Sequence, residues 1–279
     1  MKRVYADLGL LAVAIIWGLT FPVVKVALNF VSPFAFNSIR FLLTSILFIP
    51  FLKREEMRAG LAIGGATFLG YAFQTVGLQY TTSTNAGFIT STYVVFTPMI
   101  AFLLYRERIQ KIDALSVLLT VAGIYLLSGF EGVKAGDGLM ILCAVAFAFE
   151  IVLISRYAGS LSIMSLAGWQ VFAVGLLSSV PAALTTERLE INSYVIFALA
   201  LTGFLATFLA KIVQNRMQAH TDSVDAGIIL SMEGVFAHIF GVLFMNESLT
   251  SVQYSGVLLL MMALILITGI KNHIRNSDQ

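Results

Sequence analysis

Long apolar stretches recur along the whole chain, with short polar connections between them. Each stretch has about 20 mainly apolar residues, the length that a helix needs to cross the hydrocarbon core of a bilayer. Ten spanning helices are predicted, over residues 5–28, 33–52, 58–79, 84–104, 112–130, 137–155, 162–184, 193–214, 223–245 and 251–271. Membrane barrel strands are excluded because they alternate between polar and apolar positions, whereas Val257–Ile267 is apolar throughout. The pattern therefore predicts an all-α integral membrane protein with ten transmembrane helices.

Two of these helices have related sequences. Thr81–Glu107 aligns without a gap with Thr221–Glu247. The alignment places Ser91 on Ser231, and it continues into the next apolar stretch of each copy. An internal repeat at a distance of about half the chain indicates two related halves rather than an array of many repeats.

The polar segment Glu131–Asp137 marks the boundary between the halves. We expect a first five-helix repeat at residues 1–131 and a second at 135–271, with 272–279 as a short cytoplasmic tail. Because the connection is short, the halves should pack together as one domain.

Composition agrees with a membrane environment. Hydrophobic residues make up 58% of the chain and charged residues only 11%, whereas soluble domains have roughly a quarter charged residues. The mean hydropathy is +0.91. The net charge of +2 gives no indication of a nucleic-acid partner. Cys143 is the single cysteine, so it cannot form an intramolecular disulfide, and we interpret it as a small buried hydrophobic residue.

The distribution of Lys and Arg predicts the orientation in the membrane, because cytoplasmic loops are enriched in these residues. With a cytoplasmic N-terminus, the cytoplasmic ends collect Lys2, Arg3, Lys53, Arg54, Arg58, Arg106, Arg108, Lys111, Arg156, Lys211, Arg216, Lys271 and Arg275. The opposite ends keep only Lys134 and Arg188. We therefore expect a multi-pass protein of the plasma membrane with both termini cytoplasmic. Since five helices are an odd number, the two halves must cross in opposite senses, as inverted repeats.

Ionisable side chains inside the predicted helices are the main candidates for function. Arg40, Glu150 and Glu233 lie within apolar stretches, where a charge costs about 2.5–3.5 kcal/mol near the bilayer centre. Such groups must face protein or water. For Arg40, pairing with an internal acid and binding of a substrate are both compatible with the pattern.

The repeat makes Tyr93 the equivalent of Glu233, so both should approach a central cavity at similar depth. The predicted substrate-binding residues around that cavity are Trp17, Arg40, Tyr71, Gln74, Tyr93, Glu150, Trp169 and Glu233. An aromatic wall with few charges suits a small amphipathic or zwitterionic solute. Burial favours the neutral form of a carboxyl group, so Glu233 or Glu150 is also a candidate for proton coupling.

Other polar residues and prolines have simpler interpretations. Pro22 and Pro98 are predicted helix kinks, because proline cannot donate a backbone hydrogen bond. The pattern favours a surface anchor for Lys211, whereas Lys25 and His238 are compatible with more than one environment. A further group is interpreted as features of helix ends: Asp222, Asp225, Glu107 and Glu247.

Several of these residues together resemble the EamA branch of the drug/metabolite transporter superfamily. The resemblance rests on the ten stretches, on Trp17-Gly18 in the first, on Pro98 and Glu107 in the fourth, and on Gly136-Asp137 opening the sixth. An acid in the ninth, Glu233, also fits. One departure is His238 with Gly234, where the family often has a proline. The resemblance implies ten helices around a central cavity and the transport of small metabolites.

These observations predict a secondary transporter of small metabolites, such as amino acids or amphipathic compounds, with export as the expected direction. An integral-membrane enzyme and a channel are the alternatives. No loop is long enough for a catalytic domain, and neither a metal-binding motif nor a ring of like charges occurs in the sequence. We expect no cofactor and no metal, and the sequence leaves the substrate, the coupling ion and the oligomeric state open.

Overall fold

The computed structural model describes residues 3–107, 109–127, 135–185, 188–246 and 250–266. Within them the chain is helical, which confirms the predicted all-α class. The α-helices are α1 (Arg3–Ala27), α2 (Pro33–Ile46), α3 (Met57–Leu78), α4 (Ser83–Ser91), α5 (Tyr93–Tyr105), α6 (Lys111–Leu127), α7 (Asp137–Tyr157), α8 (Ile163–Thr185), α9 (Ser193–Leu201), α10 (Ala210–Gln218), α11 (Ser223–Leu230), α12 (Met232–Met245) and α13 (Ser251–Ile265). Two 3₁₀ turns, η1 (Ile49–Phe51) and η2 (Arg54–Glu56), precede α3, and a π-helical segment, η3 (Thr202–Leu209), joins α9 to α10.

Seven helical stretches in the described part of the chain are long and apolar enough to cross a membrane. They are Arg3–Ala27, Arg54–Leu78, Ser83–Tyr105, Asp137–Tyr157, Ile163–Thr185, Ser193–Gln218 and Ser223–Met245. The protein is therefore a multi-pass membrane protein. The α-helix in the second predicted stretch ends early, at Ile46, because Pro50 has no N–H to donate to the Ile46 carbonyl oxygen.

The repeated sequence forms an interrupted helix in both copies. In the first copy the break lies at Thr92, between α4 and α5. In the second it lies at Ser231, between α11 and α12, at the position equivalent to Ser91. Helix α1 continues through Pro22 and α5 continues through Pro98. The break precedes Pro98 in the first copy and occurs without a proline in the second, so proline is not its cause.

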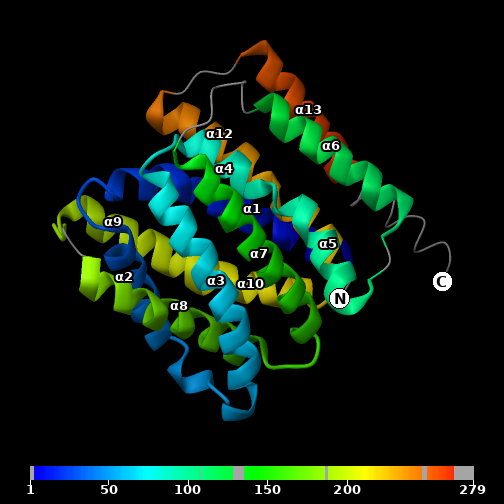
Figure 1. Cartoon of the computed structure of the whole chain (residues 1–279). Coiled ribbons are helices and arrows are strands. Elements are labelled where there is room, and N and C mark those ends of the chain that lie inside the picture. The colour runs from blue at the N-terminus through cyan, green and yellow to red at the C-terminus, as the bar shows by residue number, and fades with distance from the viewer. Residues whose placement is uncertain (1–2, 108, 128–134, 186–187, 247–249, 267–279) are drawn as a thin grey trace.

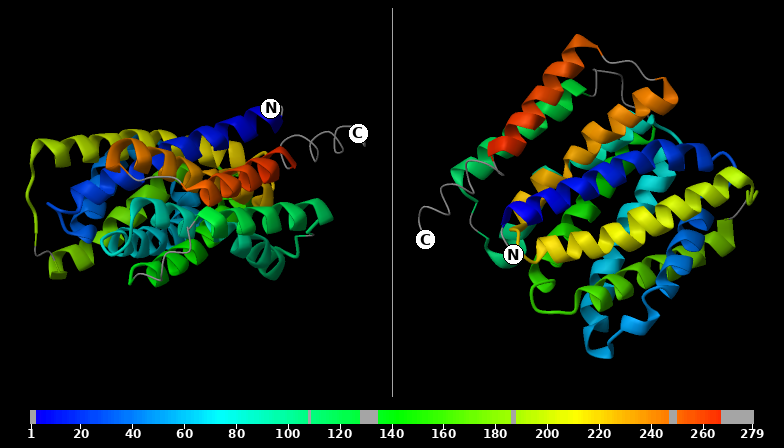
Figure 2. Two further views of the ribbon diagram at one scale, coloured as in Figure 1. Left: turned by 90° about the horizontal axis from the view of Figure 1, so that it is seen from above. Right: turned by 180° about the vertical axis from the view of Figure 1, so that it is seen from behind.

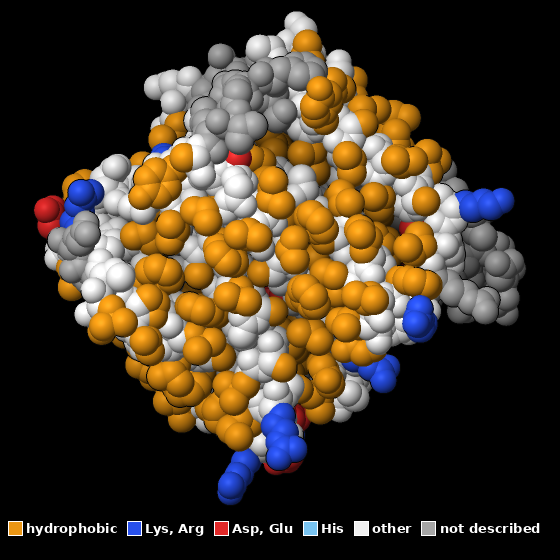
Figure 3. Space-filling view, in the orientation of Figure 1, with side chains coloured by type: hydrophobic (Ala, Val, Ile, Leu, Met, Phe, Trp, Pro, Cys, Tyr) orange, Lys and Arg blue, Asp and Glu red, His pale blue; other side chains and the backbone are white. Residues whose placement is uncertain are grey.

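The helices pack into a bundle in which elements far apart in the sequence lie side by side (Figure 1). Helix α1 packs against α12 and α10, and α3 packs between α7 and α8. Helices α6 and α13 pack mainly on each other at one edge, as Figures 1 and 2 show. Hydrophobic side chains cover the face seen in Figure 3, and the Lys and Arg side chains lie near its rim. This surface suits contact with lipid.

Small residues allow the central helices to approach closely. A Cβ atom on Gly18 would lie 2.5 Å from Cβ of Phe236, so α1 can pack on α12 only because residue 18 is glycine. A Cβ atom on Gly87 would lie 2.4 Å from Cβ of Ala237, where α4 contacts α12. These contacts hold α1, α4 and α12 together and place Trp17, the neighbour of Gly18, toward the interior.

Charged residues tie the helices together at the end that carries the N-terminus. Arg3 of α1 pairs with Asp225, which is fully buried, and lies 3.5 Å from Asp222 and 3.8 Å from Asp7. The acids at the start of α11 therefore pair with Arg3 as well as lying at a helix N-terminus. Glu107 accepts a hydrogen bond from the Ser223 hydroxyl at 2.6 Å. Its predicted counterpart, Glu247, lies outside the described residues.

Candidate functional site

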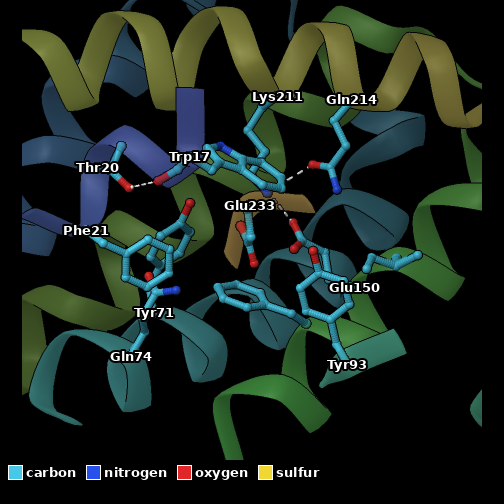
Figure 4. Close-up of a pocket in the computed structure, with 12 residues that line it drawn as sticks. Trp17, Thr20, Phe21, Tyr71, Gln74, Tyr93, Glu150, Lys211, Gln214 and Glu233 are labelled. Atoms are coloured by element: carbon cyan, nitrogen blue, oxygen red, sulfur yellow. Dashed lines mark hydrogen bonds and ion pairs between the residues drawn. The ribbon is translucent and has the colours of Figure 1, made fainter. Parts of the chain in front are cut away.

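A buried cavity lies at the centre of the bundle, where α1, α3, α5, α7, α10 and α12 converge (Figure 4). The twelve residues that line it are Trp17, Thr20, Phe21, Tyr71, Gln74, Tyr93, Phe147, Glu150, Ile151, Lys211, Gln214 and Glu233. The volume that a water molecule's centre can reach is about 20 Å³, which is room for about one water molecule. A metabolite would require the surrounding helices to move apart.

The lining residues have matching positions in the two halves of the sequence. The alignment that places Tyr93 on Glu233 also places Tyr71 on Lys211 and Gln74 on Gln214. When Asp7 near the start of α1 is placed on Asp137 at the start of α7, Trp17 falls on Phe147. The same register brings the remaining lining residues, Thr20 and Phe21, onto Glu150 and Ile151. Each lining residue of one half therefore has an equivalent lining residue in the other.

Glu150 is the centre of a buried hydrogen-bond network. Its Oε1 accepts from Lys211 Nζ at 2.5 Å and from Thr67 Oγ1 at 2.9 Å. It also accepts from Gln170 Nε2 at 3.1 Å. Glu150 and Lys211 are only 2% and 1% exposed. Because an isolated charge is costly in a buried site, each side chain needs the opposite charge of the other. The pair is electrically neutral as a unit.

The network extends along the inner faces of α8 and α10. Lys211 Nζ also donates to Gln214 Oε1 at 3.0 Å, and Asn215 Nδ2 donates to Gln170 Oε1 at 3.2 Å. The Lys211 ammonium group lies 4.7 Å from the ring centroid of Trp17, in a cation–π contact. In Figure 4, Lys211 and Gln214 point into the cavity from the side opposite Tyr71 and Gln74.

Glu233 and Tyr93 face each other in the cavity as a buried polar pair. Both side chains are buried, at 4% and 2% exposure. The two side chains interact with each other, but neither Glu233 Oε1 nor the Tyr93 hydroxyl forms a hydrogen bond of standard geometry within the residues that the structure describes. Because an unsatisfied polar atom in a buried site is costly, these atoms are suited to a polar group or proton that enters the cavity.

Two predicted site residues lie elsewhere. Arg40 does not line the central cavity, and its Nε donates to Thr207 Oγ1 of η3 at 2.8 Å. Trp169 is half-buried near the start of α3, where its Nε1 donates to the Lys53 carbonyl oxygen at 2.9 Å. Its neighbour Gln170 belongs to the Glu150 network. On α8, the residue that faces the interior is therefore the glutamine and not the tryptophan.

The prediction of a surface anchor was wrong for Lys211, which is buried and bonded to Glu150. The repeat contained the signal, because the register that pairs Tyr93 with Glu233 also pairs Tyr71 with Lys211. The other lining residues that sequence reasoning did not select are Thr20, Phe21, Phe147, Ile151 and Gln214.

Lys25 and His238 are outside the cavity. Lys25 Nζ donates to the carbonyl oxygens of Leu78 and Thr81 at 2.5 and 2.8 Å, at the C-terminal end of α3. A cation there complements the helix dipole. His238 is buried, and its Nδ1 lies 3.1 Å from Thr84 Oγ1. Cys143 is buried as a free thiol, as predicted.

Comparison with known proteins identifies relatives along nearly the whole chain. An uncharacterized transporter of Archaeoglobus fulgidus is 53% identical over 268 residues, covering 96% of this chain and 87% of the relative. A probable amino-acid metabolite efflux pump of Salmonella typhimurium is 25% identical, covering 95% and 94%. One solved crystal structure matches with a TM-score of 0.80 at 16% identity, covering 97% of this chain and 98% of its own, which shows a shared fold.

The model of the EamA-like transporter family matches residues 4–129 and again residues 134–269. The resemblance to the EamA branch of the drug/metabolite transporter superfamily is thereby confirmed, and the protein is a membrane transporter of this type. The chain belongs to the EamA-like transporter family.

Proposed function

We propose that the protein is a secondary transporter that binds small solutes in the central cavity and moves them by alternating access. Two inverted repeats of five transmembrane helices each, at residues 1–131 and 135–271, would rock about this cavity, with residues 272–279 as a cytoplasmic tail. The observation that carries the proposal is the matched lining of the cavity, to which each half contributes six equivalent residues. Substrate sites at the interface between repeats are expected in transporters of this architecture.

Contacts between the repeated helices support a two-fold relationship between the halves. The Ser91 hydroxyl donates to the carbonyl oxygen of its equivalent, Ser231, at 2.9 Å. Gly87 faces Ala237, and the equivalent of this contact, between Gly227 and Thr97, is also formed. Reciprocal contacts of this kind arise where two copies of one element cross at a symmetry axis. The Lys and Arg distribution supports cytoplasmic termini and opposite orientations of the halves.

The cavity groups suggest a division of roles. Glu150 is neutralised by Lys211, whereas Glu233 forms no ion pair within the described residues and has Tyr93 as its polar neighbour. We assign to Glu233 the binding of an ammonium group or a proton, with Tyr93 beside it in the lining. Trp17, Tyr71 and Gln74 would form the wall against the apolar part of the solute. The hydrogen bond of Trp169 to Lys53 favours a supporting role for that residue.

Export is the direction we favour. The relative from Salmonella typhimurium is named as a probable amino-acid metabolite efflux pump, and its similarity covers 95% of this chain. Amino acids and related small amphipathic compounds are therefore the solutes to test first. The narrow cavity fits such a cycle, because binding requires the halves to separate on one side of the membrane.

The test is transport by purified protein in liposomes, with radiolabelled amino acids inside and a pH gradient that can be imposed or collapsed. Glu233→Gln keeps the size of the side chain and removes its charge, so transport should fall to the level of empty liposomes. Glu55→Gln, the same change at an exposed position, is the control and should behave as the wild type. Full transport by Glu233→Gln would remove Glu233 from the mechanism. Insensitivity of the wild type to the pH gradient would exclude proton coupling.

A further inference from the structure

Arg40 is a buried cation without a buried acid beside it. The side chain is 4% exposed, and its guanidinium carbon lies 4.8 Å from the ring centroid of Phe41 and 5.0 Å from that of Tyr71. Its Nε donates to Thr207. No carboxylate in the described part of the chain lies within 4.0 Å of the guanidinium group. An uncompensated charge at such a site is expensive.

The equivalents of Arg40 and Thr207 form a second set of residues around a buried acid, Glu150. The register that places α1 on α7 also places Ser32 on Ser162, and with it Arg40 of α2 on Gln170 of α8. The repeat alignment places Thr67 on Thr207. Gln170 and Thr67 both donate to Glu150. Arg40 and Thr207, which bond each other, are the equivalents of these two donors.

The two sets differ at their centre. In the second half, Glu150 accepts hydrogen bonds from its donors. The equivalent residue in the first half is Thr20. The Thr20 hydroxyl donates within its own helix, to the Trp17 carbonyl oxygen at 2.7 Å. Both sets contain one cation, Lys211 in one and Arg40 in the other. Only the set around Glu150 contains the matching acid.

We propose that a carboxylate of the transported solute supplies this missing acid and binds Arg40 in the loaded transporter. This inference rests on the proposed function and adds the chemical class of the solute. Arg40 presents a planar fork of N–H donors that suits two-point binding of a carboxylate. The carboxylate would lie on the Thr20 side of the cavity, opposite the Glu150–Lys211 pair.

Tyr71 controls access to Arg40. Its ring lines the cavity on one side and contacts the guanidinium group on the other. It also packs edge-on against Phe147, with ring centroids 5.3 Å apart. Since the cavity must widen to admit any solute, a rotation of this ring during widening would bring Arg40 into contact with the cavity.

A second route to Arg40 comes from the outer surface of the bundle. Arg40 also lines an apolar groove of about 640 Å³ between α2 and the α9–η3 segment. A membrane amphiphile could present a carboxylate from that side. We favour the cavity because Glu150, the equivalent acid, lines it. The two sources are separated by experiment.

The experiment measures thermal unfolding of the full-length protein with each proteinogenic amino acid and with the matching amino-acid amide, which lacks the carboxylate. At least one amino acid should raise the unfolding temperature of the wild type, while its amide should not. In Arg40→Gln the apparent affinity should fall about tenfold or more, and Arg40→Lys should recover part of it. Stabilisation by amides as strong as by acids, stabilisation retained in Arg40→Gln, or no stabilisation by any amino acid would each overturn the inference.

Thr20→Glu tests the same inference with Arg40 left intact. A glutamate at the position equivalent to Glu150 should pair with Arg40, raise the unfolding temperature and abolish the response to amino acids. Thr20→Gln, of the same size but uncharged, is the matched control and should not raise the unfolding temperature. Retained amino-acid binding in Thr20→Glu would contradict the proposal.

Two further outcomes would distinguish failure of this inference from failure of the proposed function. Stabilisation by sodium oleate in liposomes, with no response to any water-soluble carboxylate, would assign Arg40 to a membrane amphiphile in the groove and overturn the inference. Transport of amines that depends on Glu233 and is indifferent to carboxylates would also overturn it, while leaving the proposed function intact.

Discussion

The Ser91 hydroxyl donates a hydrogen bond to the Ser231 carbonyl oxygen at 2.9 Å, and these are equivalent residues of the repeated helix. The bond connects the two copies at the point where each helix is interrupted. The single Ser91 hydroxyl proton is shared with Gly87 O within α4, also at 2.9 Å, while Ser231 Oγ donates to Ile228 O within its own copy. The side chain of Ser91 therefore joins the halves, whereas Ser231 contributes only its backbone carbonyl.

This difference predicts unequal effects of the same substitution. Ser91→Ala removes the connecting hydroxyl and should lower the free energy of unfolding by about 1 kcal/mol. Ser231→Ala leaves the accepting backbone carbonyl in place and should have the smaller effect. Thermal unfolding of both variants in detergent is the measurement. Equal losses would indicate that the bond between the copies contributes no more than a local one.

Close packing at Gly18 predicts a strong response to a single methyl group. In Gly18→Ala the new Cβ would meet Phe236 and the backbone of Ala237, so α1 and α12 must separate at a cost of about 1–3 kcal/mol. Gly65→Ala in α3 is the control, because no atom lies within 4 Å of the added Cβ. That variant should be as stable as the wild type or more stable, since alanine favours the helix. Similar unfolding temperatures for both variants would contradict the close contact.

The Glu150–Lys211 pair predicts non-additive mutations. Lys211→Met should destabilise the protein by about 3–5 kcal/mol, because it leaves a buried carboxylate without its counter-charge. Glu150→Gln combined with Lys211→Met removes both charges and should recover much of that loss. A double-mutant cycle on thermal stability measures the coupling. Additive effects would mean that the two groups do not stabilise each other.

The contact of Arg3 with α11 predicts a graded effect of charge removal. Arg3→Gln removes the partner of buried Asp225 and should lower stability by about 1.5–3 kcal/mol. Asp222→Asn changes an acid that is 47% exposed, where ion pairs contribute little, and should cost less. Chemical unfolding monitored by tryptophan fluorescence compares the two. A larger loss for Asp222→Asn would reverse the assigned importance of these acids.

Much of the architecture follows from the sequence because bilayer thickness fixes the length of apolar stretches. The positions of the apolar helices and the burial of Glu150 and Glu233 follow from the pattern. The break in the repeated helix does not, because the pattern predicted a kink at Pro98, whereas the helix is interrupted at Thr92 and at Ser231. Six of the eight predicted site residues line the cavity. Arg40 and Trp169 do not, since hydropathy locates a residue along a helix but not around its axis.

Lys211 and the π-helical segment show what the sequence pattern alone does not provide. A lysine near the predicted end of a spanning helix has the same pattern whether its side chain reaches the membrane surface or an internal acid. The π-helical turn at η3, where Thr207 Oγ1 donates to the Thr202 carbonyl oxygen at 2.9 Å, has no distinctive sequence. The burial of Lys211 depends on Glu150, which approaches from another helix.

The matched lining of the cavity also bears on how the two halves have diverged. The first half contributes Trp17, Thr20, Phe21, Tyr71, Gln74 and Tyr93, none of which is an acid or a base at neutral pH, whereas the second contributes Glu150, Lys211 and Glu233. A transporter assembled from two copies of the first half would have a cavity without formal charge, and one assembled from two copies of the second would have four carboxylates and two amines. The shape of the cavity therefore comes equally from both halves, whereas its charged groups come from the second half alone.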